Sequence, residues 1–299
     1  MYEPPPGHEV VCETSYRGEA MELRFVLESV GVKSKIQQYR GGWLIVVSSE
    51  HALRASDEIA SYQCEAAEQS TERSVAIPTY GGAMVGVSVY AGVLMLVAVL
   101  MGRSAFGLDW WLAGQMQAGM VMDGQWWRTI TALTLHLDPG HIGSNLVFGC
   151  VFGLMAGRVL GGGVAWLVIL FSGALGNLVN AMLQSADHTS IGASTAVFSA
   201  LGVLVAHALK PRSGPRENFL KRWSPLIGGL VIFGFTGIGG ENTDVTAHAT
   251  GLLAGLVLGW LGVALPPDWL GSRRVQQICG VAALAFVVVA WTIGLAIAG

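Results

Sequence analysis

Residues 245–264 read VTAHATGLLAGLVLGWLGVA, an apolar stretch without a single Asp, Glu, Lys or Arg. About 20 such residues are enough for a helix to cross a bilayer. Gly251, Gly255 and Gly259 recur at four-residue spacing, so one face of the helix is smooth and admits a close neighbour. His248 lies one turn before the first of these glycines. The stretch therefore predicts a tightly packed membrane helix that carries an ionisable side chain.

Apolar stretches of similar length recur through most of the chain. We expect seven membrane-spanning helices, at residues 82–102, 142–160, 163–183, 193–209, 223–239, 245–264 and 276–297. The composition agrees, since 52% of the residues are hydrophobic and only 12% are charged, against about 25% charged residues in soluble domains. This excludes a single soluble domain and a disordered chain. The lack of a basic face argues against nucleic acid as a partner.

The charged residues are concentrated near the N-terminus, where residues 1–79 hold 19 of the 37. Residues 9–68 follow strand and helix patterns in the order βαββα, with the second helix at Glu50–Ala67. We therefore expect a small soluble α+β domain ahead of the membrane domain. The expected division is a cytoplasmic domain at 1–68, a linker at 69–80, a six-helix membrane domain at 81–265, and an inner loop with an additional helix at 266–299.

The distribution of basic residues predicts the orientation in the membrane. The loop at 210–222 holds five Lys and Arg residues, whereas the loops at 184–192 and 240–244 hold none. Basic loops face the cytoplasm, and the N-terminus lacks the pattern of a signal peptide. We expect a multi-pass protein of the bacterial plasma membrane with a cytoplasmic N-terminus and a long outer loop at 103–141.

In this topology, polar side chains from three helices fall at one depth, just below the outer surface. They are His141, Asn145, Ser194 and His248. Polar and ionisable residues are costly inside a membrane and are functional candidates by default. Each one alone has a simpler interpretation, because serine is a common N-cap and a buried histidine can be structural or belong to an ion pathway.

Together these residues suit nucleophilic catalysis facing the outer side. Ser194 follows the glycine turn of Gly192-Ala193 at a predicted helix start, where backbone N–H groups can bind an oxyanion. If the helix at 193–209 packs on the glycine face of the helix at 245–264, His248 comes within reach of Ser194 and can take its proton. Asp244, one turn before His248, is expected to lie in solvent, so we expect a pair without a buried carboxylate.

Four motifs resemble the rhomboid family of intramembrane serine proteases, over roughly residues 82–264. They are Trp127-Arg128, the H-x4-H-x3-N run of His136, His141 and Asn145, the Gly192-Ala193-Ser194-Thr195 motif, and Ala247-His248-Ala249-Thr250-Gly251 followed by Gly255. A G-x-S-x motif alone is weak, but four motifs in this order on these helices are specific. The resemblance implies an α-helical polytopic membrane protein with a six-helix rhomboid-like bundle, extended here by a seventh helix.

The resemblance also implies roles for individual residues. Ser194 would be the nucleophile and His248 the general base, with the oxyanion held by the Ser194 N–H and the side chains of His141 and Asn145. The supporting residues would be His136, Trp127, Arg128, Phe198, Gly192, Gly251 and Gly255. Among them, His136 would tie the long loop to its helix, and Phe198 would pack against His248.

The sequence thus predicts a serine endopeptidase that cleaves the transmembrane helices of other proteins within the lipid bilayer, without a cofactor or a metal ion. No H-E-x-x-H motif occurs. Two alternatives stay open: a catalytically inactive rhomboid-like protein that binds membrane proteins, and a transporter. The presence of both Ser194 and His248 argues against the first. The outer position of the polar cluster and the lack of an inverted repeat argue against the second.

Overall fold

The computed structural model describes residues 2–73, 79–210, 219–236 and 243–298. The chain forms two compact units, Met1–Ile77 and Pro78–Gly299. Each unit has its own hydrophobic core and is described by itself.

The N-terminal unit is a three-stranded antiparallel sheet with two helices. Its elements are β1 (His8–Thr14), α1 (Arg17–Ser29), β2 (Ser34–Tyr39), β3 (Gly42–Ser48) and α2 (Ala52–Arg73), and the sheet order is β1-β3-β2. Leu23 and Leu27 of α1 pack on Ile45 of β3. Helix α2 continues six residues beyond the predicted end at Ala67, because residues 68–73 contain neither glycine nor proline to stop it.

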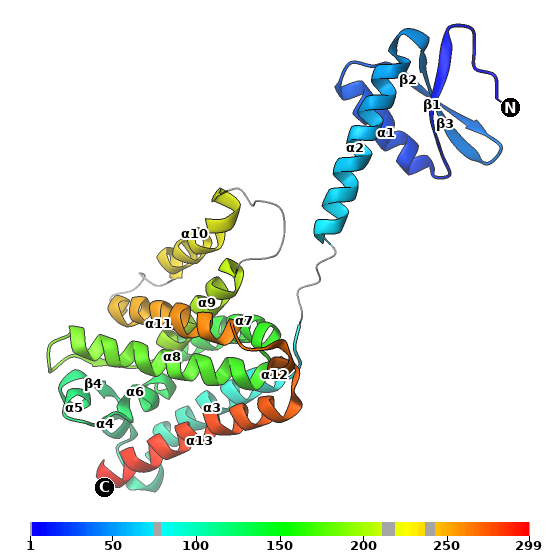
Figure 1. Cartoon of the computed structure of the whole chain (residues 1–299). Helices are drawn as coiled ribbons and strands as arrows, with labels where there is room; N and C mark the ends of the chain where they lie inside the picture. Colours follow the sequence, from blue (N-terminus) through cyan, green and yellow to red (C-terminus); the bar gives the residue numbers. More distant parts are fainter. Residues whose placement is uncertain (1, 74–78, 211–218, 237–242, 299) are drawn as a thin grey trace. The chain divides into compact units, whose positions relative to one another are not determined.

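The second unit is helical, and each predicted span is a helix where the structure describes it (Figure 1). The main helices are α3 (Ala83–Gly102), α7 (Pro139–Leu160), α8 (Gly162–Leu183), α9 (Ser194–Leu209), α10 (Phe219–Thr236), α11 (Val245–Val263) and α13 (Arg273–Ala298). Residues 237–239 of the fifth predicted span lie outside the described residues. Helix α7 begins three residues earlier than predicted, because the Asp138 side chain caps it and Pro139 suits the first helical position.

Five helices in the described ranges are long and apolar enough to span a membrane, namely α3, α7, α8, α11 and α13. The chain is thus an integral, multi-pass α-helical membrane protein. Helix α9 is apolar but has only 16 residues. It rises about 24 Å, against a hydrocarbon core of about 30 Å, so at least one of its ends lies inside the membrane.

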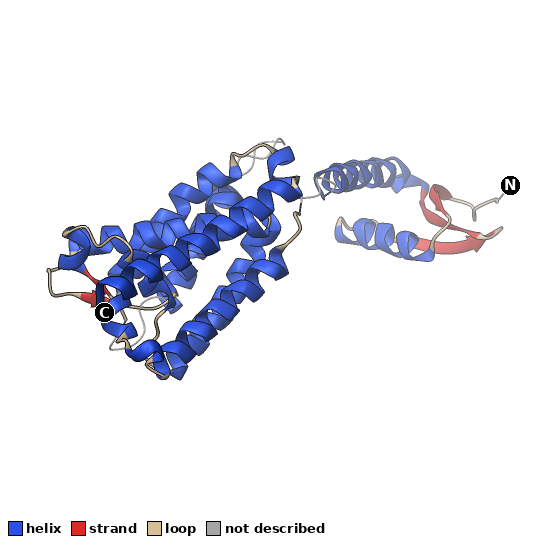
Figure 2. Cartoon of the chain, turned by 90° about the horizontal axis from the view of Figure 1, so that it is seen from below, coloured by secondary structure: helices blue, strands red, loops and turns tan. Residues whose placement is uncertain are grey.

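Short elements connect α3 to α7 across the long loop between them. They are η2 (Ala105–Gly107), α4 (Trp110–Gly114), β4 (Met116–Gln117), α5 (Ala118–Met122), α6 (Arg128–Thr131) and η3 (Ala132–Thr134). Strand β4 pairs with β5 (Thr189–Ser190), which precedes α9, and Figure 2 shows this small ribbon in red at one end of the helical bundle. The long loop is therefore folded and joined to the segment that leads into α9.

Helices α9 and α11 make the closest helix contact of the site. A methyl group on Gly251 would overlap the carbonyl oxygen of Thr195, and one on Gly255 would overlap that of Ser199. A methyl group on Gly259 would lie 2.7 Å from the Cα of Val203. These pairs keep a constant register, so the two helices run parallel with their backbones in contact. The glycine spacing in the sequence predicts a close neighbour on this face, and the structure identifies that neighbour as α9.

The seventh helix, α13, is bound to the bundle at both ends. The Gln276 side chain accepts hydrogen bonds from the N–H groups of Gly163 and Val164 (2.9 and 3.0 Å) and donates to the carbonyl of Leu160 (3.0 Å). It thereby caps the tight turn between α7 and α8. Towards the other end of α13, Trp291 Nε1 donates to Thr134 Oγ1 at 3.0 Å.

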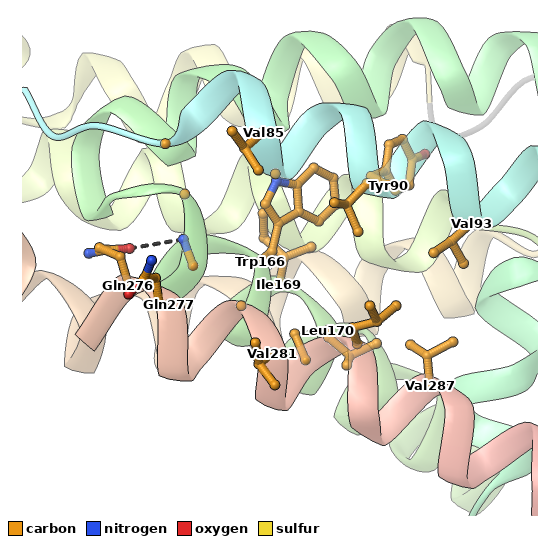
Figure 3. Close-up of a pocket in the computed structure, with 18 of the residues that line it drawn as sticks. Val85, Tyr90, Val93, Trp166, Ile169, Leu170, Gln276, Gln277, Val281 and Val287 are labelled. Atoms are coloured by element: carbon orange, nitrogen blue, oxygen red, sulfur yellow. Dashed lines mark hydrogen bonds between the residues drawn. The ribbon is translucent and has the colours of Figure 1, made fainter. Parts of the chain in front are cut away.

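A cavity of about 720 Å³ lies among α3, α8 and α13 (Figure 3). Its walls are apolar, with Val85 and Val93 on one side and Val281 and Val287 on the other. Its lining reaches Ala193 and Ala196 but does not include Ser194 or His248. Such walls suit hydrocarbon and offer few polar groups.

The glycine contact generates a stability prediction. Gly255→Ala should lower the unfolding free energy by about 3 kcal/mol, because the new methyl group meets a backbone oxygen that can yield only if α9 and α11 separate. The measurement is the thermal unfolding of the detergent-solubilised protein.

Gly92→Ala is the matched control, since a methyl group there meets no atom within 4 Å. The control should be neutral or stabilising by up to about 1 kcal/mol, because alanine favours helix over glycine. Equal unfolding temperatures for Gly255→Ala and the wild type would contradict the described packing.

Candidate functional site

The loop before α9 holds Ser194 at the first position of the helix. Gly192 has φ of +120°, which a residue with a side chain rarely adopts. Its N–H donates to the carbonyl of Ala132 at 2.9 Å, and the Ala193 N–H points to His136 Nε2 at 3.4 Å. The first N–H groups of a helix have no partner within it. The Ser194 N–H is therefore available to a ligand next to its own hydroxyl.

His141 points one nitrogen at this loop. Its Nδ1 accepts the Leu137 N–H at 3.4 Å, so the neutral ring carries its proton on Nε2. A methyl group on Gly192 would lie 2.7 Å from His141 Nε2 and 3.6 Å from Ser194 Oγ. The Nε2–H donor and the serine hydroxyl therefore converge beside Gly192, where only glycine leaves room.

His248 lies on the first turn of α11, next to the same loop. It is buried, and the register of α9 against α11 sets it level with residues 192–194. The ring of Phe198, one turn below Ser194, lies against the His248 ring with centroids 4.6 Å apart. The structure thus brings Phe198 and His248 together, one turn from Ser194 along α9.

Asn145 is buried on α7, one turn below His141, and its side chain bonds within its own helix. Its Nδ2 donates to the carbonyl of His141 at 3.0 Å. The Tyr90 hydroxyl donates to the Asn145 carbonyl at 2.8 Å, which ties α3 to this turn. One of the two amide hydrogens of Asn145 is therefore committed to α7, and the second is left for other partners.

The residues expected to fix the long loop between α3 and α7, Trp127 and Arg128, are buried in it. Arg128 Nη1 donates to the carbonyls of Leu112 and Gln115 (2.9 and 2.8 Å), and its Nε donates to Gln125. The guanidinium thereby satisfies carbonyls at the end of α4. Trp127 packs on α13, where a methyl group on Gly294 would lie 3.3 Å from its ring.

Ser199 is a residue of this region that the sequence analysis missed. Its Oγ lies 2.8 Å from the Thr195 carbonyl and 2.9 Å from the Gly251 carbonyl, so its hydrogen is shared between α9 and α11. A small hydroxyl side chain between two membrane helices is a common interhelical contact. The position of Ser199 in the sequence could have indicated this contact. It lies one turn after Thr195, on the face of α9 that meets the glycine stripe of α11 (Gly251, Gly255 and Gly259).

The expectation that Asp244 lies in solvent is wrong. Its side chain is only 16% exposed, and its Oδ1 caps α11 by accepting the Ala247 N–H at 2.9 Å. Its Oδ2 is 2.7 Å from Asn180 Nδ2 and 2.9 Å from His188 Nε2. The loop before α9 brings His188 against the start of α11, which helps to cover the carboxylate. This also explains why α8 tolerates the fully buried Asn180.

Burial changes the protonation of His136. Its side chain is 4% exposed, and its ring meets that of His141 edge to face with centroids 5.1 Å apart. Burial, with a smaller effect from His141, lowers the pKa of His136 to about 4. The ring is therefore neutral at physiological pH and keeps Nε2 as an acceptor for the Ala193 N–H.

In the described part of the chain, no three His, Cys, Asp or Glu residues gather as a metal site would require.

Comparison of the sequence with known proteins relates this chain to one family. A family model described as the Rhomboid domain matches residues 123–265. Rhomboid protease GluP of Bacillus subtilis (strain 168) is 28% identical over 174 residues, which are 58% of this chain and 33% of that protein. Putative rhomboid protease YdcA of the same organism is 30% identical over 143 residues, which are 48% of this chain and 70% of that protein.

A plant protein is similar to about the same extent. Rhomboid-like protein 11, chloroplastic, of Arabidopsis thaliana is 31% identical over 146 residues, which are 46% of this chain and 52% of that protein. The chain thus spans a third of GluP and about half of the plant protein, but 70% of YdcA.

His136 generates a prediction about pH. Its pKa is about 4 in the folded chain and about 6.5 in an unfolded chain. Between these values the unfolded chain binds a proton that the folded chain does not. Stability that is fully present above pH 6.5 therefore falls as the pH drops towards 4, by up to about 3 kcal/mol.

The test is the unfolding free energy of wild type and His136→Gln between pH 7 and pH 4. The variant should lose this part of the pH dependence, while His51→Gln, at a half-exposed histidine of the N-terminal unit, should keep it. The same pH slope in wild type and His136→Gln would show that His136 is not held neutral by burial.

Proposed function

The chain belongs to the rhomboid family, and on that premise we propose that it is an intramembrane serine endopeptidase. The observation that carries the proposal is the convergence of the Ser194 hydroxyl and the His141 Nε2–H beside Gly192, with His248 level with them on α11. A nucleophile, a base and an oxyanion donor on three different helices are the parts that acyl transfer needs.

In the proposed reaction, His248 accepts the proton of Ser194 Oγ as that oxygen attacks the carbonyl carbon of the scissile peptide bond. The tetrahedral oxyanion is bound by the Ser194 N–H and His141 Nε2–H. The C–N bond then breaks, and His248 gives its proton to the leaving amine. A water molecule, deprotonated by His248, hydrolyses the acyl-enzyme and restores Ser194.

The supporting residues act on this pair without touching the substrate. Phe198 limits the rotation of the His248 ring, with which it is in contact. His136 holds the Ala193 N–H and so the turn before Ser194. Gly192 leaves room for the His141 ring, and Gly251 and Gly255 let the backbones of α9 and α11 meet. Trp127 and Arg128 keep the long loop between α3 and α7 folded. Asn145 is not one of these supporting residues, because its second amide hydrogen joins the Ser194 N–H and the His141 Nε2–H in binding the oxyanion.

The substrates would be the transmembrane helices of other membrane proteins, cut near their outer ends. A helix hides its amides in hydrogen bonds, so helices with breakers and small residues are favoured. By the distribution of basic loops, the N-terminus is cytoplasmic and the site faces the outer side of a bacterial plasma membrane. Residues 1–68 act as a cytoplasmic accessory domain. The segment at 69–80, which begins as the last turn of α2 up to Arg73, joins it to the membrane domain at 81–265 and the additional helix at 266–299.

Cleavage by active-site variants tests the proposal. Ser194→Ala and His248→Ala should each lower kcat by at least about 1000-fold, because each removes one member of a pair that acts as a unit. The assay follows the cleavage of a reporter with a single transmembrane helix by purified protein in liposomes. Ser144→Ala, at an exposed serine of α7, is the control and should retain wild-type activity.

Two results would contradict the proposal. Equal cleavage by wild type and Ser194→Ala would exclude Ser194 as the nucleophile. A wild-type protein that binds the reporter without cutting it would favour a rhomboid-like binding protein.

The oxyanion role of His141 is tested separately. His141→Ala should lower kcat by about 100- to 1000-fold, the usual loss for one oxyanion donor, with KM changed less than about threefold. The reason is that the Nε2–H bond strengthens only when the oxyanion forms. Steady-state kinetics on the same reporter measure both constants, and a rise in KM at constant kcat would instead assign His141 to substrate binding.

A further inference from the structure

Asp244 joins the chain segments that precede the two proposed catalytic residues. It lies four positions before His248, whereas its partner His188 lies six positions before Ser194. The carboxylate of Asp244 and the ring of His188 meet at 2.9 Å, with both side chains largely buried. This hydrogen bond thus connects the segment before α11 to the segment before α9.

On one side, Asp244 builds the turn that carries His248. Its Oδ1 accepts the Ala247 N–H at 2.9 Å, and its main-chain carbonyl accepts the His248 N–H at 3.1 Å. The first turn of α11 therefore takes its position from Asp244. A shift of this residue moves the His248 backbone with it.

On the other side, Asp244 is bound to two separate elements. Its Oδ2 receives the amide of Asn180, which is fully buried on α8, at 2.7 Å. The same oxygen receives His188, which directly precedes β5 and its ribbon partner β4. Three residues after β5 the chain reaches Ala193 and then Ser194.

The carboxylate is ionised in this position. Burial raises the pKa of Asp244, but the hydrogen bonds from Ala247, His188, Ser190 and Asn180 outweigh it and keep the pKa below its usual value. A half-buried charge with this many donors is held in one geometry, since each donor would otherwise lose its partner.

We propose that Asp244 is a positioning residue, which sets the distance between His248 and Ser194 by tying the first turn of α11 to Asn180 and His188. The inference rests on the proposed protease function and deepens it. Asp244 acts through the backbone of that turn. Its bonds to Asn180 and His188, called the tie below, contribute more to the position of His248 than the helix cap on the Ala247 N–H does.

Asp244→Asn and Asp244→Ala separate the tie from the cap. Asparagine retains an oxygen for the Ala247 N–H but turns an amide towards two donors, so it keeps the cap and loses the tie. Both variants should lower kcat about 10- to 100-fold, the range expected for a displacement of about 1 Å, with KM within twofold of wild type. Asp109→Ala, which removes the comparable cap of α4, should retain wild-type kinetics.

A double-mutant cycle identifies the partner. His188→Ala should lower kcat as well, and its combination with Asp244→Asn should cost no more than Asp244→Asn alone, because both break one contact. Unfolding temperatures are measured for every variant. A loss of kcat that only follows a loss of folded protein would overturn the positioning role.

The outcomes separate the two proposals. If wild type cleaves and Ser194→Ala does not, while both Asp244 variants keep the wild-type kcat, the positioning proposal is wrong and the protease proposal stands. If Asp244→Asn is fully active and only Asp244→Ala is impaired, Asp244 is a helix cap and the positioning proposal is again wrong. A wild type that does not cleave overturns both.

Discussion

The backbone contact between α9 and α11 is the constraint on which the site depends. Helices in a membrane gain little from the hydrophobic effect, so close packing and hydrogen bonds must hold them together. The glycine stripe of α11 allows the close packing. Ser199 provides the hydrogen bond, because it shares its hydrogen between the carbonyls of Thr195 and Gly251. The parallel register then sets the first turn of α11 beside the turn that precedes Ser194.

Polar side chains also fix the ends of the helices that this contact aligns, near Ser194 and His248. Asp244 joins α11 to α8 and to the segment before α9, His136 supports the turn before Ser194, and Arg128 binds the carbonyls of the outer loop. Unsatisfied polar groups are costly in a low-dielectric environment. Each of these groups therefore holds two or more elements in one arrangement. A reaction between side chains of different helices requires such rigidity.

The parts of this arrangement that depend on spacing could be predicted from the sequence. The glycine repeat indicates one helix face in any surroundings, and the apolar lengths give the positions of the helices. The burial of Asp244 could not be predicted, because its partners Asn180 and His188 are 64 and 56 residues away and meet it only after the loops fold. The same holds for Trp291 and Thr134, which are 157 residues apart. The hydrogen bond from the Asn145 amide to the His141 carbonyl could not be predicted either, because residue spacing does not show which of several nearby acceptors the amide binds.

The central claim is that the α9–α11 contact makes His248 the base that activates Ser194. A fluorophosphonate probe tests it without a substrate, because it forms a covalent bond with a serine whose hydroxyl is activated by a neighbouring base. Mass spectrometry of peptides from the labelled wild-type protein should find the adduct on Ser194, and labelling should be lost in His248→Asn. An adduct on another serine, or equal labelling of Ser194 in wild type and His248→Asn, would contradict the account.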